Sequence, residues 1–148
     1  MIFSRVASVT LATALAACSA PEKVATNSNA LILNDDLGDR LVDLCSREAP
    51  PAYDGRWQVS QADVRTVERV LLDDHAEILA RAEIAESDFV QDYVRDYAGF
   101  TREGRRYLYG SYGPMPGIGL CDGGPGFFGV EYEMPSGKVT HVDYNGGV

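Results

Sequence analysis

The chain has 148 residues and carries 13 Lys and Arg against 22 Asp and Glu, which gives a formal net charge of −9 at pH 7. This length suits a single folded domain. An acidic surface repels phosphate backbones and anionic head groups, which argues against nucleic-acid binding and against membrane attachment through a basic patch.

The chain begins with a segment typical of an export signal. Arg5 is its only charged residue, and an apolar run rich in Ala, Leu and Val follows over residues 6–17. This run is too short to span a bilayer, and no stop-transfer pattern follows it. We therefore expect residues 1–17 to be a signal peptide.

The run Leu15–Cys18, with the sequence Leu-Ala-Ala-Cys, ends this segment and resembles the lipobox of bacterial lipoproteins. The resemblance implies that the Cys18 thiol takes a diacylglycerol and that Cys18 becomes the first residue of the mature chain. The next residue is Ser19 rather than the Asp that marks inner-membrane retention in enteric lipoproteins. By that resemblance we expect a lipid anchor in the outer membrane, facing the periplasm. Ordinary cleavage after Ala20 would instead release a soluble secreted protein.

The stretch after the signal is expected to be a linker. Residues 18–30 lack large apolar side chains and should form a flexible tether that reaches about 20 Å. A single domain then occupies residues 31–148.

Within this domain, the run Asp73-Asp74-His75 suggests a metal site, but adjacent helical positions point in different directions and cannot chelate one ion. We expect no metal and no cofactor.

Two cysteines remain after the lipobox. Cys45 and Cys121 form an even pair in an exported, oxidising setting, where a disulfide between them is expected. The alternative is a Cys–His nucleophile, which oxidation would abolish. Neither His75 nor His141 lies in a motif that supports it.

Helical spacing of apolar residues dominates the first part of the domain. Ser60 and Asp63 resemble a capping box at the start of one helix, and Gly99 is expected to end another. Cys45 falls on the apolar stripe of the first helix, as a disulfide into the core would require. The four expected helices cover residues 35–47, 61–73, 76–85 and 88–98.

From residue 105 the pattern becomes typical of strands, which are expected over 105–112, 127–134 and 138–144, with a hairpin turn at 135–137. One face of the hairpin is apolar and should cover the helices; it holds Phe128, Val130, Tyr132, Met134, Thr140, Val142 and Tyr144. The other should face solvent; it holds Glu131, Glu133, His141 and Asp143. The expected class is α+β, with three to four N-terminal helices packed on a small C-terminal antiparallel sheet, a three-stranded meander.

A Gly-rich connection over residues 110–126 separates the first two expected strands. No Lys-Ser/Thr follows its glycines and no helix begins there, so a phosphate-binding loop is not indicated. The glycines either serve tight turns or let the loop contact a ligand or partner. The candidate contact residues, together with nearby aromatic side chains, are Asp122, Gly123, Gly124, Tyr109 and Tyr112.

One pair of residues suggests acid–base chemistry. Glu131 and His141 are expected to face each other across the hairpin, which resembles half of a catalytic site. Such pairs are also ordinary on solvent-exposed sheet faces. A small exported hydrolase that uses Glu131 and His141, or Asp122 in the Gly-rich loop, is therefore the alternative function.

A second resemblance covers the C-terminal part of the chain. The runs Cys121–Gly124, Phe127–Tyr132 and Tyr144–Gly146, with Arg95–Gly99 and Gly104–Arg106, are similar to small exported bacterial proteins of unassigned function. This resemblance implies a compact domain and no particular activity. We predict a non-enzymatic, lipid-anchored envelope protein that acts as a binding or structural module, with an envelope protein or a glycan as partner. An inhibitor of exported hydrolases is one concrete version.

Overall fold

The computed structural model describes residues 29–34, 36–43, 46–116 and 122–146. The signal peptide, the lipidated Cys18 and most of the tether lie outside the described residues, and so do Cys45 and Cys121 with their predicted disulfide. Within the part of the chain described here, no helix is long and apolar enough to cross a membrane.

The core of the structure is one mixed sheet of six strands. Its order is β1-β3-β4-β5-β6, and β2 pairs with β3 beside β1. β1 runs parallel to β3, and all other pairs are antiparallel. The strands are β1 (Ala30–Ile32), β2 (Gly55–Arg56), β3 (Val94–Arg102), β4 (Arg105–Gly113), β5 (Phe128–Glu133) and β6 (Lys138–Tyr144).

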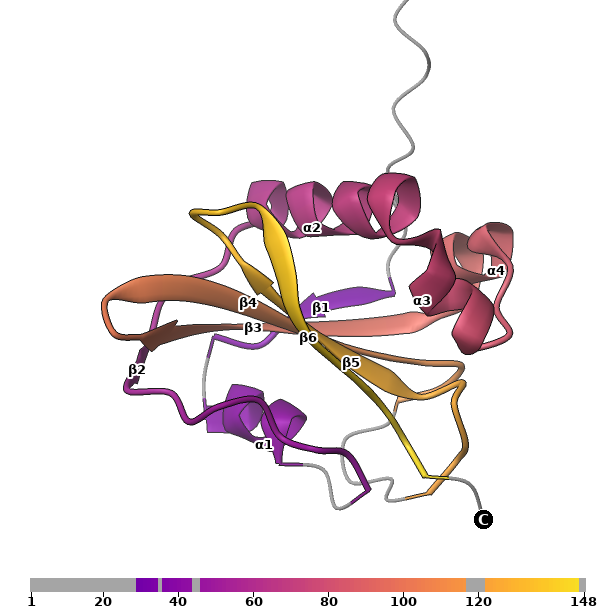
Figure 1. Ribbon diagram of the computed structural model, residues 1–148, viewed down its shortest axis with the longest axis horizontal. Coiled ribbons are helices and arrows are strands. Elements are labelled where there is room, and N and C mark those ends of the chain that lie inside the picture. Colours follow the sequence, from indigo (N-terminus) through magenta and orange to yellow (C-terminus); the bar gives the residue numbers. More distant parts are fainter. Residues whose placement is uncertain (1–28, 35, 44–45, 117–121, 147–148) are drawn as a thin grey trace, which may run out of the picture.

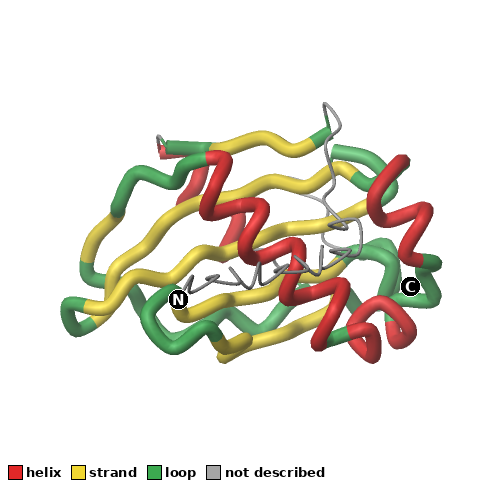
Figure 2. Tube along the Cα trace, turned by 90° about the horizontal axis from the view of Figure 1, so that it is seen from above, coloured by secondary structure: helices red, strands yellow, loops and turns green. Residues whose placement is uncertain are grey.

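Helices and a long loop cover the two faces of the sheet. The helices are η1 (Asp36–Gly38), α1 (Asp39–Val42), α2 (Gln61–Asp74), α3 (Ala76–Arg81) and α4 (Glu86–Gln91). In Figure 1, α2 lies above the sheet and α1 below it, and Figure 2 shows the long helix crossing the strands diagonally. We call the side under α2 to α4 the helix face. The other side, covered by α1 and by residues 46–54 (the strap), is the strap face.

Helix α2 forms where its sequence signal predicted it. The Ser60 hydroxyl accepts from the Asp63 N–H at 3.3 Å, and the Asp63 carboxylate accepts from the Ser60 N–H at 2.9 Å. This capping box supplies two of the hydrogen bonds that a helix start lacks. The helix buries Val64, Val67 and Leu71 against the sheet, and its prediction is confirmed.

The predicted architecture of helices packed on a three-stranded meander is wrong. The main error concerns residues 88–98, because α4 ends at Gln91 and the chain enters β3 at Val94. Six consecutive residues of β3 are buried, since both faces of this strand are covered. A strand buried on both sides does not alternate, so its apolar residues imitate helical spacing. Gly99, expected to end a helix, lies inside the strand.

Smaller departures have local causes. The helix expected over 35–47 is reduced to η1 and α1, which end at Val42. The hairpin at 135–137 and its two strands are confirmed, but a bulge between Glu131 and Tyr132 shifts the register. Thr140 therefore turns to the strap face instead of the helix face. This strap face was expected to be exposed to solvent, yet Glu131 is 1% and Glu133 7% exposed. Tyr53 of the strap contacts Glu131, and Glu133 bonds to Arg105, Tyr107 and Ser136.

A buried ion pair lies between α2 and the sheet. Arg95 Nε is 3.0 Å from Glu68 Oε1, and the Tyr97 hydroxyl donates to the same oxygen at 2.6 Å. Burial raises the pKa of Glu68, and the contacts with Tyr97 and Arg95 oppose the rise. Arg95 also donates to the carbonyls of Phe89 and Val90. These bonds attach α4 to β3 and fix the helix layer on the sheet.

Candidate functional site

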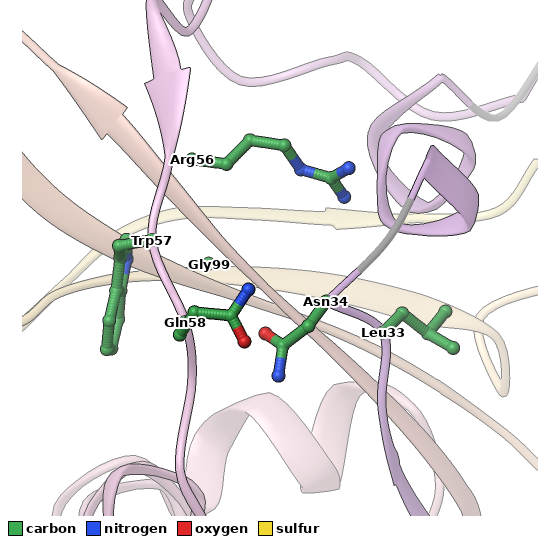
Figure 3. Close-up of a pocket in the computed structure, with 6 residues that line it drawn as sticks. All are labelled: Leu33, Asn34, Arg56, Trp57, Gln58 and Gly99. Atoms are coloured by element: carbon green, nitrogen blue, oxygen red, sulfur yellow. The ribbon is translucent and has the colours of Figure 1, made fainter.

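A pocket of about 90 Å³ opens at one edge of the sheet (Figure 3). We call it the edge pocket; its lining residues are Leu33, Asn34, Arg56, Trp57, Gln58 and Gly99. It exists because two short strands share the edge of β3. β1 pairs up to Tyr97, while β2 begins to pair at Phe100. The chain after β1 then leaves toward α1, and the chain after β2 leaves toward α2, so a gap remains over Gly99.

Hydrogen bonds hold both sides of the edge pocket in place. The Leu33 N–H donates to the Tyr97 carbonyl at 2.8 Å, and the Trp57 N–H donates to the Gly99 carbonyl at 3.2 Å. Across the gap, the Asn34 side chain accepts from the Val59 N–H at 3.1 Å and donates to its carbonyl at 3.4 Å. The amide of Asn34 thus imitates a strand partner and ties the two segments together.

The floor of the edge pocket requires glycine. A Cβ at Gly99 would lie 2.5 Å from the Trp57 carbonyl oxygen and 2.7 Å from a methyl group of Val59. Any larger residue would therefore push the β2 segment away from β3. The indole of Trp57 is fixed as well, because its Nε1–H donates to the Tyr107 carbonyl at 2.9 Å.

The polar side chains at the edge pocket all carry hydrogen-bond donors, and the amides of Asn34 and Gln58 carry an acceptor oxygen as well. In Figure 3 the amide groups of Gln58 and Asn34 point toward each other, and Arg56 extends across the side nearer α1. Arg56 lies 3.6 Å from Asp39 and 3.9 Å from Asp36, two exposed carboxylates. Exposed contacts of this length are weak. The guanidinium and the Gln58 amide can therefore still donate to an incoming acceptor.

The strap face contains the most strongly bonded carboxylate of the site candidates. Glu131 accepts from both terminal nitrogens of Arg102 at 2.9 Å, from the Tyr53 hydroxyl at 2.6 Å and from Thr140 at 2.6 Å. Burial raises the pKa of Glu131, but these donors together outweigh it and lower that pKa overall. Arg102 also lies 4.0 Å above the Tyr107 ring.

The predicted Glu131 and His141 pair is opposed in register, but the two side chains have other partners. The Glu131 carboxylate is held as described above, and His141 Nε2 lies 2.8 Å from the Glu48 carbonyl. Neither group is arranged as the base or acid that the hydrolase alternative requires. In the described residues, no group of three His, Cys, Asp or Glu side chains could hold a metal ion.

The candidate contact residues of the Gly-rich connection do not form one surface. Asp122 and Gly123 are exposed, and the Gly124 N–H donates to the Gly146 carbonyl at 3.1 Å, next to the bridge between Asp122 and Gly146. Tyr109 and Tyr112 are each 1% exposed and belong to the cores of opposite sheet faces. An exposed aromatic patch beside the loop is therefore absent from the described structure.

Sequence reasoning missed the edge pocket altogether. Asn34, Arg56 and Gln58 belong to no motif, and they become neighbours only because β1 and β2 pair with the same strand. These strands have three and two residues, too few to show a period. A search of protein-family models finds no match for the chain, and comparisons with curated proteins and with solved structures find no significant match either.

Proposed function

We propose that this chain is a lipid-anchored binding module of the bacterial cell envelope and that the edge pocket is its contact surface. The observation that carries the proposal is the set of donors at the pocket. Arg56 and Gln58 face an opening at the edge of the sheet, and none of the described residues that line it carries a carboxylate, imidazole, hydroxyl or thiol group. Such a lining can hydrogen-bond to polar groups of a partner, acceptors above all at Arg56, and it is not suited to transferring protons.

The size of the edge pocket favours a macromolecular partner over a free small molecule. Ligand pockets usually enclose about 300–1,000 Å³, whereas this one has about 90 Å³. It can receive one side chain or one carbonyl group. A partner that inserts a single group must obtain the rest of its affinity from the surrounding surface.

The sequence supports placing this surface in the envelope. Leu15–Cys18 follows an apolar signal segment, and the tether joins the lipid to the domain. The Asn29 side chain donates to the Gln91 carbonyl at 3.0 Å, and β1 follows at once. The contact surface lies beside β1, the strand next to the tether. By the lipobox resemblance, we propose that it faces the periplasm from a lipid in the outer membrane.

Site-specific crosslinking in cells tests the proposal. A photoreactive residue replaces Gln58 in the full chain, and the matched control replaces Gln61, an exposed residue of the same type at the start of α2. We expect a defined crosslinked product from position 58, absent from position 61 and reduced by Arg56→Ala. Equal products from both positions, or none, would contradict a contact surface at the edge pocket.

The anchor is tested separately. Mass spectrometry of the envelope-purified chain should show acyl groups on Cys18, and Cys18→Ser should leave an unprocessed or soluble product. An unmodified mature chain that starts at Pro21 would refute the anchor and leave a secreted protein.

A further inference from the structure

The outer edge of β1 offers free backbone groups next to the edge pocket. The Arg95 N–H donates to the Asn29 carbonyl, and the Leu33 N–H donates to the Tyr97 carbonyl, both at 2.8 Å. In a parallel pair, alternate residues of a strand bond to the same neighbour. Residues 29, 31 and 33 therefore face β3, and Ala30 and Ile32 turn their N–H and C=O groups outward. Among the described residues, no strand pairs with that side.

The side chains of β1 leave this edge accessible. Ala30 and Ile32 pack toward the core of the helix face, while Leu31 points to the other side and is 55% exposed. Another strand placed along β1 would gain the outward backbone groups and an apolar contact with Leu31. One or two residues further along, at about 3.3 Å per residue, it would cross the edge pocket.

The opposite edge of the sheet, β6, also has no further strand paired to it among the described residues, but its residues and its pairing differ from those of β1. β6 begins with Lys138, carries Asp143, and pairs with β5 through a bulge at Glu131 and Tyr132. Charged residues and bulges are the usual means by which proteins keep an edge strand from pairing. β1 has the sequence Ala-Leu-Ile and contains none of them. Of the two edges, β1 is therefore the better suited to accept a strand.

We propose that the occupant of the edge is an extended, basic polypeptide segment, which adds to β1 as a strand and places a carbonyl group against Gln58 and Arg56. This inference rests on the proposed function and specifies its partner. The charge of the segment follows from complementarity, because the exposed Asp36 and Asp39 outnumber Arg56 beside the edge pocket. The chain as a whole has a net charge of −9, so a second copy of it would be repelled.

Three synthetic nonapeptides test this assignment against the full exported chain, labelled with ¹⁵N and held in detergent micelles. One alternates Val and Lys, one alternates Val and Glu, and the third is the Val–Lys peptide with a central Pro, which cannot pair as a strand. We expect the Val–Lys peptide to shift the backbone amides of Ala30 and Ile32 and the side-chain amide of Gln58. The other two should bind at least about tenfold more weakly, since each loses one of the two recognition features.

Two substitutions localise the binding. Gln58→Ala should weaken the Val–Lys peptide about fivefold, the equivalent of one neutral hydrogen bond, while Gln61→Ala should stay within about twofold. Ala30→Pro removes one outward N–H and should also weaken binding, with an unchanged spectrum elsewhere showing that the sheet is intact.

The outcomes separate this inference from the proposed function. If no peptide shifts Ala30 and Ile32 while crosslinking at position 58 succeeds in cells, the surface binds a partner but not by strand addition. Equal binding of the Val–Lys and Val–Glu peptides refutes the basic character. Shifts produced by a soluble peptidoglycan fragment alone, or by raising the protein concentration alone, identify a glycan or a second copy and overturn the proposal.

Discussion

Replacing Glu131 by Gln tests the network beneath the strap. The carboxylate is 1% exposed and receives all its hydrogen bonds from donors on Arg102, Tyr53 and Thr140. A Gln side chain keeps one acceptor oxygen and turns the other position into a donor. The two hydroxyl groups can rotate to accept from the new NH₂ group, but a guanidinium cannot accept. At least one bond from Arg102 is therefore lost.

The structure sets the size of the effect. A hydrogen bond to a charged group contributes about 1.5–3 kcal/mol, and breaking a buried ion pair costs about 3–5 kcal/mol. The Arg102 side chain is 19% exposed and can turn to water, which reduces that cost. We expect Glu131→Gln to lower the free energy of unfolding by about 2–4 kcal/mol at pH 7. A solvent-exposed pair with His141, as the sequence suggested, would contribute only about 0–1 kcal/mol.

The effect should depend on pH. The donors around Glu131 lower its pKa in the folded state, so its contribution is present above the pKa of the unfolded chain. It is lost as the pH falls through the folded-state value. The difference between wild type and Glu131→Gln should therefore be largest at pH 7 and smaller at about pH 3, below the unfolded-state pKa.

Urea unfolding followed by the fluorescence of Trp57, the single tryptophan, measures this difference. The control is Glu48→Gln, which makes the same chemical change on an exposed strap side chain and should alter stability by less than about 0.5 kcal/mol. The reasoning fails if Glu131→Gln costs no more than Glu48→Gln, or if its cost is the same at both pH values.

Three further predictions concern the rest of the scaffold. Glu68→Leu should lower the free energy of unfolding by about 3–5 kcal/mol in urea, because it removes the carboxylate that pairs with the buried Arg95. The double variant Glu68→Leu/Arg95→Met should recover most of that loss. Gly99→Ala should lower the free energy of unfolding by about 1–3 kcal/mol, since its Cβ would lie 2.5 Å from a main-chain oxygen. An unchanged urea midpoint would mean that the β2 segment can move away from Gly99 at little cost. In the exported protein, Cys45 and Cys121 should resist alkylation until reduced, and free reactivity of both thiols would refute the disulfide.

Local signals in the sequence predicted the elements that depend on local contacts. The capping box of Ser60 and Asp63 fixes the start of α2 from residues three positions apart. The hairpin turn at 135–137 brings β5 and β6 together in the same way. Each of these elements is stabilised by neighbours in the chain, so its residues carry the information about its structure.

Elements that depend on distant contacts could not be predicted. Two hydrogen bonds between distant residues hold the strap. The Tyr53 hydroxyl donates to Glu131, 78 positions away, and the Arg47 guanidinium donates to Asn145, 98 positions away. Nothing near Glu131 in the sequence shows that a loop will cover it. For that reason the sheet face that carries Glu131 was expected to be exposed to solvent. The bulge that turns Thr140 toward Glu131 was likewise not predicted.

The edge pocket was missed for the same reason as β3. A helix over 88–98 would have no edge for β1 and β2 to share, so the wrong assignment of this segment also removes the pocket. Once β3 forms, its edge is longer than either partner, and Gly99 is left at the junction between Tyr97 and Phe100. Two short strands on one long strand thus produce both the gap and the free outer side of β1. The binding surface that we propose is therefore a consequence of the strand pairing, and it would be lost if β1 or β2 were extended to close the junction.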